Sequence, residues 1–253
     1  MANVDDFFID DNSVGLISET SYENINSIID EIEAFSRLTY KSVYIIDYYK
    51  RNFLYVSKNP LFLCGLSPEE VKELGYYFYI NNVPKEDLDF LLEINVKGFE
   101  FLRNIPAENK KKYTISYCFN IINTQSKKKQ LINHQISRLK LTKSGEIWLA
   151  ICVASIPSNG TAGEIIMSLD GANTLWKYNR ISKKWKEMPR FELKDIELNV
   201  LKYSAMGYTM NEIADLVHRS FDSVKVYRKT ILEKLGADNI TEAINFAMNF
   251  RLI

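Results

Sequence analysis

Histidine and cysteine are scarce in this chain, which has two histidines and three cysteines among 253 residues. His134 and His218 are too few for a histidine-built metal site, and the sequence shows no Ser-His-Asp cluster. Cys64, Cys118 and Cys152 lie far apart without a CxxC pair, so we predict neither a disulfide framework nor a zinc site. We expect these cysteines to be small buried side chains. The scarcity argues against an enzyme.

A dominant charge and a long apolar run are also absent. Lys plus Arg and Asp plus Glu both total 32, so no global field points to a polyanionic partner, and such a partner must meet a local patch. The first residues lack the basic and apolar regions of a secretory signal, and no apolar run approaches the roughly eighteen residues of a membrane span. We expect a cytoplasmic protein without a membrane partner.

The first part of the chain predicts helices and a hairpin. A helix is expected over 20–38, with Thr20 and Glu23 at capping-box spacing. Its apolar stripe from Ile25 to Phe35 fits either a domain core or a dimer seam. The segments "SVYIID" and "NFLYVS" predict a hairpin, because they are rich in β-branched and aromatic residues and enclose a polar turn. Ser67 then begins a helix, and "PKEDLDFLLEINVKGFEFL" predicts a longer one.

Three more strands follow in an antiparallel meander. They are expected in "YTISYCFNI", "KQLINHQISRLKL" and "EIWLAICVASI", the last apolar enough to be central. His134 is interpreted as a polar residue on a half-exposed strand. The segment "EIIMSLDGANTLWKYN" predicts another hairpin, and "RISKKWKEMPR" is interpreted as a basic connector.

This order of elements, with "GYYFYI" before "VPKEDLDFL" and three closing strands, resembles a PAS domain over about residues 42–156. The resemblance implies a sensor fold that binds a small ligand or a partner domain. For the aromatic run from Tyr76 to Tyr79, ordinary packing and a ligand cage both stay open.

Dense helix signals mark the C-terminal part. Gly207 is expected to stop one helix, and Thr209 with Glu212 forms a capping box for the next. Ser220 is the N-cap candidate of a helix over 221–235, which Gly236 ends, and a fourth helix follows. A short helix, a tight turn and a longer helix predict a helix-turn-helix.

One side of the helix over 221–235 is predicted to be exposed and to bind double-stranded DNA. On this side five residues follow each other at spacings of three and four, with Arg228 at the margin: Asp222, Lys225, Val226, Lys229 and Glu233. The basic side chains suit phosphates and base edges, and Val226 suits a thymine methyl group.

The same residues resemble the DNA-binding domain of LuxR-type (GerE-type) transcription regulators, through "SFDSVKVYRKTILEKLG", "NITEA", Glu197 and the "EIA" that follows Gly207. The resemblance implies that Ser223, Lys225, Val226 and Lys229 face the groove. It places Arg228 and Lys234 near phosphate and the last helix in a dimer. The chain departs from the family pattern at three positions: Arg219, Tyr227 and Thr230.

The sequence thus predicts an α+β fold: a PAS-like antiparallel sheet with helices, followed by an all-α four-helix helix-turn-helix domain. The predicted parts are an N-terminal segment over 1–40, a PAS-like sensor with an extra hairpin over 41–187, and a LuxR-type domain over 188–253. We expect a non-enzymatic, homodimeric transcription regulator with no catalytic or metal site and no cofactor beyond an unidentified small ligand. RNA polymerase is a further candidate partner. The alternative is a protein-interaction adaptor, because eight basic residues face nine acidic ones from Phe191 onward.

Overall fold

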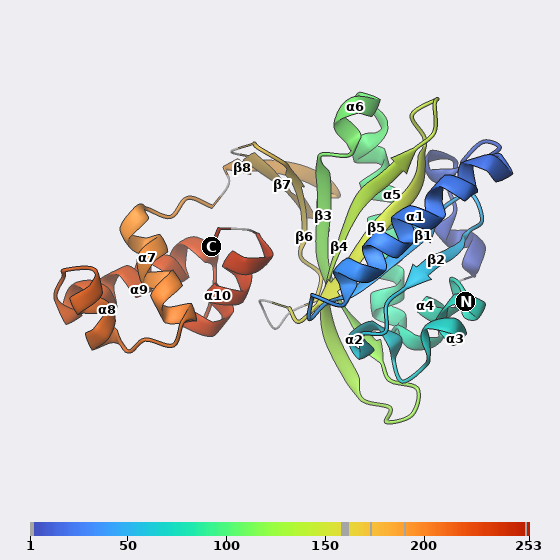
Figure 1. Cartoon of the computed structure of the whole chain (residues 1–253). Helices are drawn as coiled ribbons and strands as arrows, with labels where there is room; N and C mark the ends of the chain where they lie inside the picture. The colour runs from blue at the N-terminus through green and yellow to red at the C-terminus, as the bar shows by residue number, and fades with distance from the viewer. Residues whose placement is uncertain (1–2, 158–161, 173, 190, 251) are drawn as a thin grey trace. The chain divides into compact units, whose positions relative to one another are not determined.

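An antiparallel sheet with the strand order β2-β1-β5-β4-β3-β6-β7-β8 organises the first part of the chain (Figure 1). The computed structural model describes residues 3–157, 162–172, 174–189, 191–250 and 252–253. The strands are β1 Ser42–Asp47, β2 Asn52–Val56, β3 Tyr113–Ile122, β4 Lys129–Leu141, β5 Ile147–Ser155, β6 Ile165–Leu169, β7 Thr174–Asn179 and β8 Lys184–Pro189.

The helices fall into two sets along the chain. The set that accompanies the sheet comprises η1 Val4–Phe7, η2 Asp10–Asn12, α1 Glu19–Ser36, α2 Pro60–Leu63, α3 Pro68–Leu74, α4 Tyr77–Asn82, α5 Lys85–Arg103 and α6 Ala107–Lys110. The second set comprises α7 Asp195–Ala205, α8 Met210–Leu216, α9 Phe221–Leu235 and α10 Ile240–Asn249.

Both faces of the sheet are apolar, and helices cover each of them. Alternate residues of β1 point to opposite faces, so Tyr44 and Ile46 pack with helices α2 to α5, whereas Ile45 packs with α1. Figure 1 shows α1 and α5 on opposite sides of the sheet. Ile25 is the fully buried residue of α1 and lies in the same cluster as Trp148 of β5. The α1 stripe therefore packs on the sheet.

The predicted fold class is confirmed. The hairpin β1–β2, the long helix α5 and the meander β3–β4–β5 form where the sequence predicted them, and β5 lies in the middle, between β1 and β4. Capping explains several helix starts: the Ser67 hydroxyl accepts from the Glu70 amide, and the Glu70 carboxylate accepts from the Ser67 amide.

Two local predictions were wrong. Helix α1 begins at Glu19 rather than Thr20, and no capping box forms, because the Thr20 hydroxyl hydrogen-bonds the Ser18 hydroxyl at 2.9 Å. The expected connector over 180–190 contains strand β8, whose Trp185 packs against the core; position 190 lies outside the described residues. As an edge strand rich in lysine, β8 lacks the apolar alternation that identifies a half-buried strand.

The polypeptide forms two compact units, and the chain passes from the first to the second at Met188 and Pro189. The second unit has its own core, in which Val200, Ile213, Val224 and Ile231 are fully buried. None of the described helices has the length and apolar character needed to span a membrane.

The position of α1 predicts different costs for two substitutions on one stripe. Ile25→Ala should lower the free energy of unfolding of the first unit by about 2–4 kcal/mol, because Ile25 is 2% exposed and its removal leaves a cavity. Phe35→Ala is the control, because Phe35 is 57% exposed. It should change the free energy of unfolding by about 0.5 kcal/mol or less. Denaturant unfolding of both variants measures this; equal losses would contradict the packing of α1 described above.

Candidate functional site

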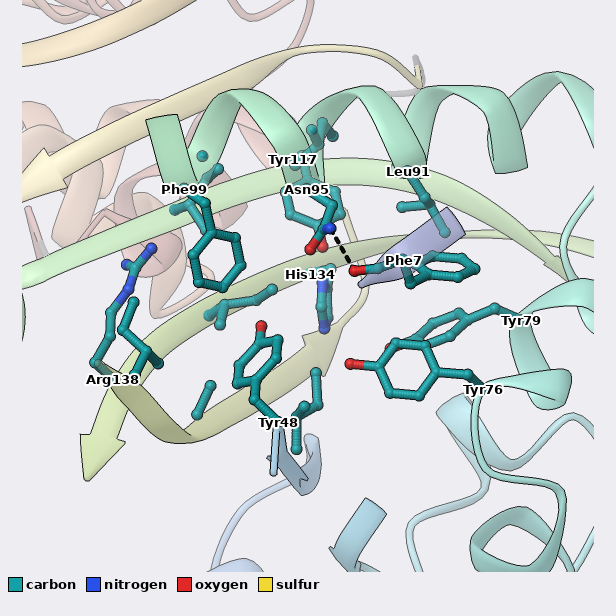
Figure 2. A pocket seen from close by; sticks show the side chains of 17 residues that line it. Phe7, Tyr48, Tyr76, Tyr79, Leu91, Asn95, Phe99, Tyr117, His134 and Arg138 are labelled. Carbon is teal, nitrogen blue, oxygen red and sulfur yellow. Dashed lines mark hydrogen bonds between the residues drawn. The ribbon is translucent and has the colours of Figure 1, made fainter. Parts of the chain in front are cut away.

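The first unit contains a cavity of about 60 Å³ between α5 and the sheet face that α2 to α5 cover (Figure 2). Aromatic rings make up much of its wall: Phe7, Tyr48, Tyr76, Tyr79, Phe99 and Tyr117. Phe7 comes from the N-terminal segment, and its carbonyl accepts a hydrogen bond of 2.7 Å from the Asn95 amide of α5. Segments far apart in sequence therefore meet around a space with room for a few water-sized groups, at about 10–15 Å³ for each.

The aromatic run of α4 divides between the core and the cavity. Tyr76 and Tyr79 are both buried and line the cavity, Phe78 is fully buried in the core, and Tyr77 is 55% exposed. Packing and cavity lining thus occur together, and the two interpretations of this run are not exclusive.

His134 lies inside the cavity wall, not on a half-exposed strand as the sequence predicted. It is 1% exposed, because β4 has neighbours on both sides and α5 above it. Its Nε2 hydrogen-bonds the Tyr44 hydroxyl, which lies 2.8 Å from the Tyr79 hydroxyl. Burial lowers the pKa of His134 to about 3, so the imidazole is neutral at physiological pH.

Arg138 is a cavity residue that the sequence analysis missed. It follows Ile132, His134 and Ile136 at alternate positions of β4, which places a cation on the apolar face. That alternation is the signal by which the sequence could have identified it.

The second unit contains the predicted helix-turn-helix. In α8 the Thr209 hydroxyl and the Glu212 carboxylate form the predicted capping box. His218 adopts the left-handed conformation in the turn, with φ 51°, and the Ser220 hydroxyl caps α9 through the Ser223 amide at 3.2 Å. Gly236 ends α9 with φ 64°, a conformation that glycine adopts readily.

The exposed side of α9 collects five of the six candidate DNA-binding residues. Lys225 and Lys229 are exposed, Val226 is 62% exposed, and Ser223 and Arg228 are partly buried. The opposite side of the helix packs into the core of the unit. This side of α9 therefore carries Lys225 and Lys229 around Val226, with the exposed acids Asp222 and Glu233 at its two ends.

Lys234, the sixth candidate, has a partner inside the unit. Its Nζ lies 2.7 Å from the carboxylate of Glu197, which is 3% exposed on α7. Burial raises the pKa of Glu197, but the hydrogen bonds from Lys234 and from the Lys194 amide have a larger effect. The pKa of Glu197 therefore lies below its ordinary value. Lys234 thus joins α9 to α7, and a phosphate contact by it stays a prediction.

Comparison with known families decides the character of the second unit. Residues 193–247 match the model of bacterial regulatory proteins of the luxR family. The second unit is a luxR-family domain. The predicted resemblance is confirmed, and the helix-turn-helix described above is the core of this domain. No curated protein matches the chain significantly.

Solved structures are similar to the chain at low levels. A phage VqmA–DPO complex is 18% identical, with 92% of this chain and 91% of that chain covered and a TM-score of 0.35. A Vibrio cholerae VqmA dimer is 15% identical, with coverage of 87% and 86% and a TM-score of 0.32. The PAS/PAC sensor domain of a Marinobacter aquaeolei diguanylate cyclase is 13% identical, with coverage of 46% and 94% and a TM-score of 0.36. Such scores support no inference on function.

The buried His134 predicts a loss of stability in acid. The unfolded chain takes up a proton near pH 6.5 that the folded unit resists down to about pH 3, so stability is full above 6.5 and falls as pH falls. Between pH 6.5 and 5 the contribution is about 2 kcal/mol, at about 1.4 kcal/mol per pH unit. Between pH 6.5 and 5, the free energy of unfolding of the first unit should fall by about 2 kcal/mol less in the His134→Phe variant than in the wild type. Parallel curves for both proteins would contradict the assignment.

The ion pair between Lys234 and Glu197 predicts a structural effect in the luxR-family domain. Lys234→Ala should lower its free energy of unfolding by about 1–2 kcal/mol, because a buried carboxylate loses its cation. Lys225→Ala, an exposed position on the same helix, should leave it unchanged within about 0.5 kcal/mol. Chemical denaturation followed by circular dichroism gives both values, and an unaffected Lys234→Ala variant would refute the structural importance of the pair.

Proposed function

We propose that this chain is a transcription regulator that binds double-stranded DNA through α9 and responds to a small ligand in the cavity of its first unit. The observation that carries the proposal is the exposed face of Lys225, Val226 and Lys229 on the helix that a luxR-family domain uses in its helix-turn-helix. Ser223 and Arg228 border this face. In a major groove the two lysines would meet phosphates or base edges, and Val226 would meet a thymine methyl group.

The charge of the luxR-family domain implies that two copies act together. From Phe191 onward eight basic residues are opposed by nine acidic ones, so one copy offers few uncompensated cations. The Lys229–Glu233 pair at 3.7 Å is exposed on both sides and holds Lys229 only weakly. A homodimer on half-sites about one helical turn apart would supply the missing affinity. The resemblance to luxR-type regulators places the last helix, α10, in the contact between the two copies, and its Met248 is 52% exposed.

The ligand would act by shifting populations. A molecule that binds one arrangement of the dimer more tightly than another changes how often both α9 helices fit their half-sites. RNA polymerase is the partner through which a bound regulator would act on transcription. The same charge balance favours a second candidate, an adaptor whose two units both bind proteins.

Selection from a random DNA pool tests the proposal. The full chain should enrich a two-fold-symmetric sequence, and Lys225→Glu with Lys229→Glu should reduce affinity for it at least about 100-fold, because two contacts become repulsive. Lys202→Glu, an exposed position on α7, controls for the charge change and is compared with Lys225→Glu alone. Affinity should also fall steeply between about 50 and 200 mM salt. Salt-insensitive association with a protein, and no enriched DNA in the presence or absence of ligand, would favour the adaptor.

A further inference from the structure

The guanidinium of Arg138 is buried at one end of the cavity. Arg138 is 7% exposed, and its Nη1 donates a hydrogen bond of 3.1 Å to the Tyr113 carbonyl. In the part of the chain that the structure describes, its guanidinium forms no ion pair with an Asp or Glu carboxylate. Burial lowers the pKa of Arg138 to about 10, which leaves it cationic at neutral pH.

The neighbouring side chains do not supply the missing negative charge. Burial raises the pKa values of Tyr48 and Tyr117, so both hydroxyl groups stay protonated. Burial also raises the pKa of the Cys152 thiol, which therefore stays protonated. Neutral dipoles surround the cation, and they compensate it only in part, because a buried charge needs an ionic partner to recover its lost hydration.

The rest of the cavity suits an apolar body. Figure 2 shows Phe99 and Tyr48 between Arg138 and His134, with Tyr76 and Tyr79 towards the other end. Isoleucines from several strands complete the wall: Ile46, Ile115, Ile136 and Ile147. A molecule placed here would have a charged end at Arg138 and a nonpolar remainder against rings.

A second polar group of the cavity lining is His134. The Nδ1 of His134 is buried and has no hydrogen-bond partner among the described residues. Water could satisfy this atom in a cavity of about 60 Å³, because a water molecule needs only about 10–15 Å³ measured in this way. Water carries no charge, however, and so it leaves the Arg138 cation uncompensated.

We propose that the cavity binds a small organic monoanion, with its charged group on Arg138 and its apolar body against Tyr48 and Phe99. One cation implies one negative charge, and the small volume excludes a large molecule. His134 offers a further hydrogen bond to a polar atom of the ligand. The inference deepens the proposed function, since it names the chemical class of the signal.

Three acid–amide pairs of increasing size test the charge requirement on the full chain: acetate and acetamide, butyrate and butyramide, benzoate and benzamide. Each compound is titrated at constant ionic strength while thermal unfolding of the first unit and calorimetric binding are recorded. At least one acid should bind saturably and about ten-fold or more tightly than its amide, because the amide leaves the guanidinium unpaired. Chloride at the same concentration should not raise the unfolding temperature comparably, because chloride lacks an apolar body.

Two substitutions at Arg138 link the preference to this side chain. Arg138→Met removes the charge at similar length and should abolish the acid–amide difference, whereas Arg138→Lys should retain it. Without ligand, Arg138→Met should unfold at the same temperature or several degrees higher, because an uncompensated buried charge is gone. Arg37→Met, on an exposed ion pair of α1, is the control and should retain the wild-type preference.

Equal binding of acid and amide at every size, or an undiminished preference in Arg138→Met, would overturn the proposal. An Arg138→Met protein that unfolds several degrees lower would overturn its premise, since the guanidinium would then already be compensated. DNA binding is measured separately on the same preparations. If no acid is preferred over its amide but the protein still binds its operator, only the proposed ligand class is refuted. If the protein binds no operator with or without the test compounds, the proposed regulator function is refuted.

Discussion

The sheet of the first unit has two apolar faces, and the need to cover both determines the arrangement of its helices. β5 contributes buried residues to both sides, as do the alternating residues of β1. Helix α1 shields one face, and α2 to α5 shield the other. Exposure of either face would leave several large side chains in water, at a cost of about 1.5–3 kcal/mol for each.

The cavity is a consequence of how the second of these faces is packed. Rings from the N-terminal segment, the turn after β1, α4, α5 and β3 meet there, and these planar side chains leave a space between them. The space contains polar groups that a core does not usually retain. Arg138 and His134 are two of them, and burial of both side chains costs hydration that the apolar wall does not return.

The luxR-family domain is organised by its helix ends. Helix α8 spans Met210–Leu216, too short to be stable alone, so side-chain caps and tertiary packing must support it. The caps of Thr209 and Ser220 define where α8 and α9 begin, and the core contacts of Val224 and Ile231 determine which side of α9 remains free. The free side is therefore specified by packing on the opposite side.

The sequence by itself determined the elements whose signals are local: caps within three or four residues, alternation within one strand, and the apolar stripe of a helix. Hence the boundaries of α9 and the meander β3–β4–β5 were predictable. Only the tertiary structure decided the burial of His134, the cavity beside Arg138, the pairing of Lys234 with Glu197 and the edge strand β8. Each of these depends on atoms brought together from distant parts of the chain. Alternation within a strand predicts which residues share a face, but it does not determine which face is covered, which charge is paired or which edge is occupied.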